Sequence, residues 1–339
     1  MRHPARQRGV AVVTALLLTT LAITIVASLF WQQQVQVRSI ENQRLQLQKE
    51  WILRGALDWT RLILREDARY SRVDHLGEPW ATPLAETRLD QYVENAGSDS
   101  TNPDAVLSGG IVDAQSRFNL ANLCQNGVVQ PDEVAAFGRL LTYLRQNASL
   151  ANATAALMQA AQQGQAGQAG QTGQTGQAGT NGNPSGGTQV AATSATSSAD
   201  TPQPVDIHYV DDLLAVPGFT PQVLDAIRDF VVVLPKPTTV NVNTAPVEVL
   251  AARIATLSLA DAAAAVAMRE NAWFTGLPDF LARMQVQGKN VATTGLSTTT
   301  EFFLVNGNVR LNRATMRMQA LIQRNNQTFA TQVLWIRES

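Results

Sequence analysis

The first thirty-one residues constrain the fold of this chain more than any other segment. A short basic leader with Arg2, Arg6 and Arg8 ends in Gly9, and an uncharged apolar run extends from Val10 to Trp31. The run has about twenty-two residues, enough to cross a hydrocarbon core of about 30 Å as a helix. A conventional secretory signal has its small-residue cleavage site after the apolar region. Here the small residue comes first, so a cut at Gly9 would leave the apolar helix on the chain.

Two interpretations of this segment are open. One is an ordinary single-pass anchor whose arginines keep the N-terminus in the cytoplasm, by the positive-inside rule. The other rests on a resemblance, because a glycine before an apolar helix is similar to the class III signal of type IV pilins and type II secretion pseudopilins. A membrane-embedded aspartic peptidase cleaves that signal on its cytoplasmic side and methylates the new N-terminus. The resemblance implies cleavage after Gly9 and a methylated Val10.

The helical pattern continues beyond the apolar run. From Trp31 to Asp67 there is no proline and a single glycine, Gly55. An uninterrupted helix from Val10 to Asp67 would be roughly 85 Å long. Its first half would lie in lipid or a fibre, and its amphipathic second half would lie on a globular domain. The apolar face of that second half comprises Leu45, Ile52, Ala56, Trp59 and Ile63, and the opposite face comprises Arg44, Gln48, Arg54, Arg61 and Arg65.

Composition excludes some classes of function. The chain has 26 Lys and Arg against 27 Asp and Glu, so its net charge of −1 provides no global attraction to nucleic acid or to an anionic membrane surface. Cys124 is the single cysteine, which rules out an intrachain disulfide even in an oxidising compartment. We expect Cys124 to be a small buried apolar residue.

The middle of the chain predicts a mixed region followed by helices. Residues 75–83 are loop-like, and Leu107 to Leu123 alternates enough for short strands. Pro131 to Leu144 predicts a helix with acidic residues in its first turn. From about Gln162 the sequence becomes a Gly-Gln-Ala/Thr repeat, followed by Ser, Thr and Ala up to about Asp200. This tract has almost nothing to bury, so we expect a flexible insertion.

The last third predicts more helices and then strands. Val210 to Val233 indicates a helix, a turn and a second helix capped by Thr220. Thr239 to Arg253 indicates an extended entry and a helix whose cap would be Thr244, with Pro246 in the first turn and Glu248 completing a capping box. Further helices are expected over Leu259–Arg269 and Leu277–Met284, and strands over Phe302–Val305, Met316–Ile322 and Phe329–Trp335. This order favours an α+β domain interrupted by a helical block.

Five motifs in a fixed order resemble one family. They are RGVAVVTALLL in the leader and apolar run, VDHLGEPWA at Val73–Ala81, SRFNLANL at Ser116–Leu123, DDLLAVPGF at Asp211–Phe219 and TVNVNTAPVEVLAA at Thr239–Ala252. The chain resembles the K-class minor pseudopilins of type II secretion systems (GspK) through them. The resemblance implies the pseudopilin fold, an α+β arrangement with a long N-terminal helix on a small antiparallel sheet and a large inserted α-helical domain.

The expected domain boundaries follow from the motifs and the composition. They are a leader over 1–9, an apolar helix half over 10–31 and an amphipathic half over 32–67, the first part of the α+β domain over 68–120, an inserted α-domain over 121–290 that includes the low-complexity tract 162–204, and C-terminal strands over 291–339.

The resemblance also implies a function. It implies a non-enzymatic subunit, anchored in the bacterial inner membrane with a cytoplasmic N-terminus, that caps a periplasmic pseudopilus together with I- and J-class minor pseudopilins. Such a subunit helps to initiate assembly and supports export of folded proteins across the outer membrane. Its other partners would be the remaining pseudopilins of the fibre and the prepilin peptidase. We expect partners to bind the exposed stripe of the long helix, marked by Leu45, Ile52, Trp59 and Ile63.

Thr14 departs from most pilins and pseudopilins, which carry a glutamate five residues into the mature chain. That glutamate neutralises the terminal amine of a neighbouring subunit, because an unpaired charge in an apolar fibre core is costly. A neutral residue fits an ordinary anchor. It also fits, as the family implies, a subunit at a tip that has no neighbour on one side.

Calcium binding is the cofactor question that the sequence raises. Family members often carry an acidic calcium-binding loop in the α-domain, which supplies several oxygen ligands. Here that place holds the Gly/Gln/Ser tract, with no carboxylate until Asp200. Asp206, Asp211 and Asp212 are weak candidates, more typical of solvated or capping residues, so we expect no cofactor.

Other functions find less support. His3, His75 and His208 are isolated, and no phosphate loop, His-Glu-x-x-His or Cys-x-x-Cys pattern is present, which argues against an enzyme. VPGFTPQVLDAI resembles the hairpin of helix-hairpin-helix modules, but its surroundings are acidic, whereas phosphate binding needs a basic footprint. A minor pilin of a type IV pilus is the remaining alternative, which the bulky helical insertion disfavours.

Overall fold

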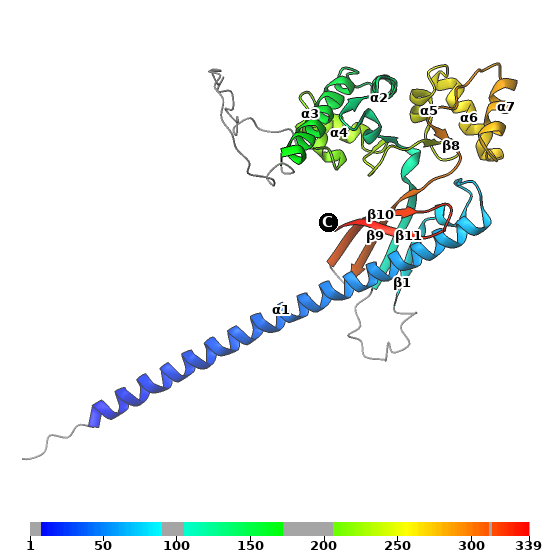
Figure 1. Ribbon diagram of the computed structural model, residues 1–339. Helices are drawn as coiled ribbons and strands as arrows, with labels where there is room; N and C mark the ends of the chain where they lie inside the picture. The colour runs from blue at the N-terminus through cyan, green and yellow to red at the C-terminus, as the bar shows by residue number, and fades with distance from the viewer. Residues whose placement is uncertain (1–7, 90–104, 172–205, 312–313, 339) are drawn as a thin grey trace, which may run out of the picture.

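The computed structural model describes residues 8–89, 105–171, 206–311 and 314–338. They form a long N-terminal helix, a five-stranded antiparallel sheet and a helical block (Figure 1). The helix extends away from the rest of the molecule at its N-terminal end and lies along the sheet at its C-terminal end. The helical block lies on the side of the sheet remote from the apolar end of the helix.

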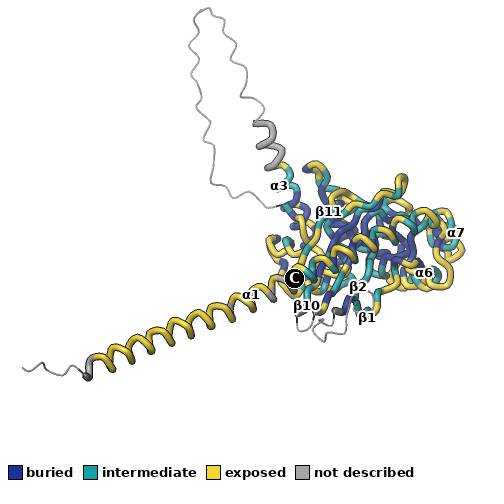
Figure 2. The backbone as a smooth tube through the Cα atoms, turned by 90° about the horizontal axis from the view of Figure 1, so that it is seen from below, coloured by how far each residue is buried: buried dark blue, intermediate teal, exposed yellow. Residues whose placement is uncertain are grey.

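The N-terminal helix α1 spans Arg8–Tyr70 without a break, as the sequence predicts. Its segment Ala11–Ile40 is long and apolar enough to cross a membrane, and its most apolar 18 residues have a mean hydropathy of 2.4 and are not buried. Figure 2 shows this half as a fully exposed rod and the other half in contact with the folded body. Leu53, Leu57 and Leu64 of the second half are buried against the sheet.

The sheet has the order β1-β2-β9-β10-β11, and all its pairings are antiparallel. Its central pair joins β2 to β9, so strands that flank the helical block in the sequence are neighbours in space. The three expected C-terminal strands are confirmed, although β9 and β10 are longer than expected and β11 begins two residues later than expected. The strands are β1 (Leu84–Arg88), β2 (Ala105–Asp113), β9 (Phe302–Leu311), β10 (Ala314–Arg324) and β11 (Thr331–Glu338).

Gly109 shows how closely β2 and β9 approach each other. It lies opposite Gly307, and a Cβ atom at Gly109 would come within 2.3 Å of the carbonyl oxygen of Asn306. Only glycine allows this approach of the two backbones.

Between β2 and the helix that begins at Pro131 the chain forms short elements. The expected short strands are therefore one nine-residue strand, β2, followed by turns of 3₁₀ helix and two-residue strands. The elements are η1 (Pro79–Ala81) before the sheet, and η2 (Ala114–Ser116), β3 (Phe118–Asn119), η3 (Leu120–Leu123), β4 (Cys124–Gln125) and β5 (Val128–Val129) after it.

The helical block has its own apolar core. Parallel two-residue pairs, β3 with β6 and β7 with β8, lie at its two junctions with the sheet domain. Phe137 and Leu140 of the helix expected over Pro131–Leu144 are fully buried in its core, and Cys124 is buried as expected. The remaining elements are α2 (Pro131–Tyr143), α3 (Leu150–Gln171), η4 (Val210–Ala215), α4 (Pro221–Ile227), β6 (Val231–Val232), β7 (Val240–Asn241), α5 (Val247–Arg253), α6 (Leu259–Asn271), α7 (Leu277–Val286) and β8 (Leu296–Ser297).

The junctions of this block lie slightly outside the expected span 121–290. Phe118 and Leu120 belong to its core on one side, and Val291 and Leu296 on the other. The short parallel pairs extend the block, because each brings a strand from one junction against a strand of the block itself.

One of the two expected helix caps is wrong. Thr244 does not cap α5, which begins at Val247 with Pro246 before it, because the Thr244 hydroxyl donates to the buried carboxylate of Asp113. By contrast, Thr220 caps α4 as expected, since its hydroxyl accepts from the Val223 amide.

The start of the low-complexity tract is helical rather than flexible, since α3 continues to Gln171. Alanine and glutamine are good helix formers. Gln162 also anchors the helix, because its side-chain oxygen accepts from the Gly127 amide at 2.7 Å. The rest of the tract, up to 204, lies outside the described residues.

Candidate assembly helix and polar junction

An exposed apolar surface continues along α1 beyond the candidate membrane span. Trp51 is 69% exposed and Trp59 is 51% exposed, although both lie on the half of the helix that contacts the folded body. Exposed apolar patches of this kind mark contact surfaces rather than solvated faces. The large exposed aliphatic and tryptophan side chains of α1 beyond the candidate span are Leu47, Trp51, Trp59 and Leu62.

The predicted partner-binding face lies beside the face of α1 that packs on the sheet. Leu53, Leu57 and Leu64 pack on the sheet, whereas Ile52 and Ile63 are half-buried at the flank of that face. The side chain of Leu45 lies outside the described residues. Three of the four predicted residues, Ile52, Trp59 and Ile63, therefore lie between the face of α1 that packs on the sheet and the face exposed to solvent.

A groove beside α1 extends this apolar surface. It has a volume of about 420 Å³ and separates the helix from β1 and β2. Apolar side chains dominate its lining, among them Ala56, Trp59, Ile63, Trp80 and Leu84. The flank of the helix and the edge of the sheet together offer one continuous apolar surface.

The predicted processing residues lie at the start of α1. Gly9 and Val10 are both helical, one and two residues after its first residue. Thr14 is exposed, and its hydroxyl donates to the carbonyl oxygen of Ala11 at 3.1 Å. A threonine that bonds its own helix in this way is tolerated in apolar surroundings.

Asp206, Asp211 and Asp212 each form a hydrogen bond or an ion pair with a neighbouring group of the helical block. Asp212 accepts from the amides of His208 and Tyr209 at 2.9 and 2.8 Å, and so caps η4. Asp211 forms an ion pair with Arg228 at 2.7 Å. Asp206 accepts from the amide that follows it. Of the three, only Asp212 caps an element, and among the described residues their carboxylates form no cluster that could hold a metal ion.

A buried ionic network, absent from the sequence predictions, ties the end of α1 to the sheet. Arg324 on β10 pairs with Asp67 of α1 and with Asp74 of the following loop, and all three side chains are 3–5% exposed. Asp74 also accepts from the Thr300 amide at 2.6 Å. The Arg324 guanidinium stacks on Phe303. Nothing in the strand pattern marks Arg324 as buried, although Asp74 falls within the quoted motif VDHLGEPWA.

Asp113 links the sheet to the helical block. It ends β2, and one carboxylate oxygen accepts from Asn241 at 2.9 Å, from Thr300 at 2.6 Å and from the hydroxyl of Thr244. The other oxygen accepts from the Gln115 amide. Burial raises the pKa of Asp113, while these hydrogen bonds oppose the rise. Neutral donors thus satisfy this carboxylate at the junction of the two parts.

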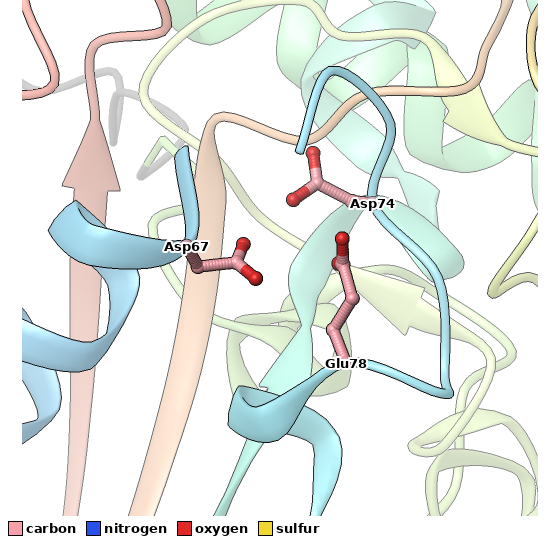
Figure 3. Close-up of side chains that lie close together, drawn as sticks. All are labelled: Asp67, Asp74 and Glu78. Carbon is pink, nitrogen blue, oxygen red and sulfur yellow. The ribbon is translucent and has the colours of Figure 1, made fainter. Parts of the chain in front are cut away.

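Glu78 brings a further carboxylate to the network. Its Oε2 accepts from the indole of Trp80 at 2.7 Å and from the His75 amide at 3.1 Å. Burial is the main reason that the pKa of Asp67 is raised to about 6 and that of Asp74 to about 7, and the charge of Glu78 adds to the rise at Asp67. Figure 3 shows the side chains of Asp67, Asp74 and Glu78 directed toward one another.

Comparison with known proteins decides the family. Models described as "Type II secretion system (T2SS), protein K" match residues 116–236 and 240–299, together just over half of the chain. The chain belongs to this family. It is also 37% identical over 147 residues to the type II secretion system protein K of Pseudomonas aeruginosa, a match that covers 41% of this chain and 40% of that relative.

A solved structure supports the pseudopilin fold. The chain is similar to one in the crystal structure of the GspK–GspI–GspJ complex from enterotoxigenic Escherichia coli, with a TM-score of 0.60. The similarity covers 89% of this chain and 99% of the solved one at 18% sequence identity. The expected architecture, a long helix on an antiparallel sheet with a helical insertion, is confirmed.

Proposed function

We propose that this chain is a non-enzymatic minor pseudopilin that assembles with I- and J-class minor pseudopilins at the tip of a periplasmic pseudopilus. There it would help to initiate assembly and support export of folded proteins across the outer membrane. The observation that carries the proposal is the exposed apolar flank of α1, which continues from the candidate membrane span to Leu62. The similar solved chain comes from a GspK–GspI–GspJ complex, which supports I- and J-class proteins as partners.

The position of the helical block supports a place at the tip. The block lies at the end of the molecule remote from the apolar half of α1 (Figure 1). If subunits stack through their N-terminal helices, a block at the far end leaves little room for another subunit beyond it. Thr14 fits the same place, because a tip subunit has no neighbour on one side whose terminal amine needs a carboxylate.

The proposed topology follows from the leader. Its arginines favour a cytoplasmic N-terminus, so the sheet and the helical block would lie in the periplasm of a protein anchored in the inner membrane. Cleavage after Gly9 and methylation of Val10 would leave α1 from Val10 onward as anchor and fibre element. Mass spectrometry of the mature chain tests this step: a methylated Val10 is expected, and an intact Met1 or a cut after Ala27 would contradict it.

Partner binding is tested by co-purification of the full chain with I- and J-class pseudopilins expressed together. Trp59→Arg places a charge on the exposed flank of α1 and should reduce recovery of both partners, since a buried unpaired charge is costly. Val286→Arg is the matched control, because Val286 is 83% exposed and lies on α7 of the helical block. Equal recovery with both variants would argue against α1 as the interface.

A further inference from the structure

Three carboxylates meet where α1 joins the sheet. Asp67 comes from the last turns of α1, and Asp74 and Glu78 come from the loop after it. One oxygen from each lies within 4.8 Å of the other two. Figure 3 shows that they come from two sides and face a common point.

The charges in this cluster do not balance. Three carboxylates face one buried cation, Arg324, which pairs with Asp67 and Asp74 and not with Glu78. The Nδ1 atom of His75 accepts from the Gly77 amide, so it donates no hydrogen bond to the carboxylates. Buried carboxylates that exceed their cations are costly. One divalent cation would neutralise the excess.

Glu78 provides a second, independent observation. The residue is 5% exposed, and its Oε1 is buried without a hydrogen-bond partner. The ring nitrogen His75 Nε2 lies 3.8 Å from Oε1, beyond hydrogen-bond distance. Most buried polar atoms in folded proteins are hydrogen-bonded, so an exception inside an acidic cluster points to a ligand.

The cluster can be reached from solvent. A surface depression of about 580 Å³ has Asp67 and Glu78 in its lining, together with Glu66, Tyr70 and His75. A hydrated ion could therefore enter between α1 and the loop and retain water on the open side.

We propose that Asp67, Asp74 and Glu78 bind a hard divalent cation of the Ca²⁺ type. The donors are all carboxylate oxygens, and their mutual distances suit ligand distances of about 2.3–2.6 Å, with water completing the shell. Bound there, the ion fastens the C-terminal end of α1 to the loop that leads into the sheet. The site is separate from Asp206, Asp211 and Asp212, and it does not depend on the proposed position at the tip.

The test uses the full chain in detergent, stripped of metal with a chelator. Addition of Ca²⁺ should raise the melting temperature, because a ligand of the folded state stabilises it by mass action. Glu78→Gln removes one charge and keeps the shape of the side chain. This variant should lose at least about tenfold in apparent Ca²⁺ affinity. Without metal it should melt no lower than the parent chain, because it relieves the excess negative charge.

A triple variant, Asp206→Asn, Asp211→Asn and Asp212→Asn, is the matched control and should keep the Ca²⁺ response. Terbium supplies a direct readout, because Trp80 donates to Glu78 and lies close enough to sensitise a lanthanide bound beside it. That emission should disappear in Glu78→Gln. The proposal is overturned if Ca²⁺ leaves the parent melting temperature unchanged, if Glu78→Gln responds like the parent, or if the triple variant loses the response. It is also overturned if Glu78→Gln is less stable without metal, since the carboxylate would then be structural.

Discussion

Replacing Arg324 by methionine should be among the most damaging single changes in the sheet domain. The Arg324, Asp67 and Asp74 side chains are 3–5% exposed, so the change leaves carboxylates buried without their cation. Removing one partner of a buried ion pair costs about 3–5 kcal/mol. The same change at Arg310 removes a pair at 4.0 Å whose side chains are 55% and 70% exposed. Pairs of that kind contribute about 0–1 kcal/mol, so Arg310→Met is the control.

The assay is urea denaturation of the full chain in detergent with chelator, followed by tryptophan fluorescence. Trp80 packs edge-on against Phe303, the ring on which Arg324 stacks, so its emission reports on this part of the sheet. Adding Asp74→Asn to Arg324→Met should recover at least about 1 kcal/mol, because it removes one of the stranded charges. The reasoning is refuted if Arg324→Met costs no more than Arg310→Met, or if the double variant is less stable than the single one.

Other expected outcomes concern the core, the sheet and one helix cap. Leu57→Ala should cost about 2–5 kcal/mol in urea denaturation, because Leu57 is 3% exposed between α1 and the sheet; a cost near zero would mean that α1 does not pack there. Gly109→Ala should lower the melting temperature and weaken amide protection on β2 and β9, because its Cβ would meet the Asn306 carbonyl at 2.3 Å; unchanged protection would contradict this close approach. Asp261 should titrate near pH 2 by NMR, since hydrogen bonds from Ser258 hold its pKa at about 2. Its contribution to stability is thus present above the unfolded pKa of about 4 and is lost as the pH falls through 2. Ser258→Ala should raise that pKa, and an unchanged titration would argue against the capping box.

Elements with a strong local signal could be predicted from the sequence. The absence of proline and the apolar and amphipathic spacing predicted α1 as one helix, and alternation predicted the C-terminal strands. The sequence did not indicate which side of α1 faces the sheet, because apolar side chains occupy both the buried face and the face beside it. Leu53 and Ile52 are equally apolar, and only the position of the sheet decides which of them is covered.

Some residues of the candidate sites could be predicted from the sequence, and others could not. Gly9, Val10 and Thr14 could be singled out because their meaning depends on position relative to the apolar run. The cluster of Asp67, Asp74 and Glu78 could not, although Asp74 and Glu78 lie in a conspicuous motif. Acidic residues near a helix end usually face solvent, and nothing local indicates that these are buried beside an arginine from the far end of the chain.

The sequence by itself determined the membrane-length helix, its amphipathic continuation, the order of helical and extended segments and the resemblance to a family. These properties depend on residues a few positions apart, so they can be predicted from periodicity and motif spacing. Only the tertiary structure decided which side of α1 is covered, that Thr244 serves the Asp113 carboxylate rather than a helix cap, and that Arg324 meets Asp74 across 250 residues of sequence. Burial depends on partners that are distant in the sequence, and it determines both the charge balance of the acidic cluster and the surface that α1 leaves exposed.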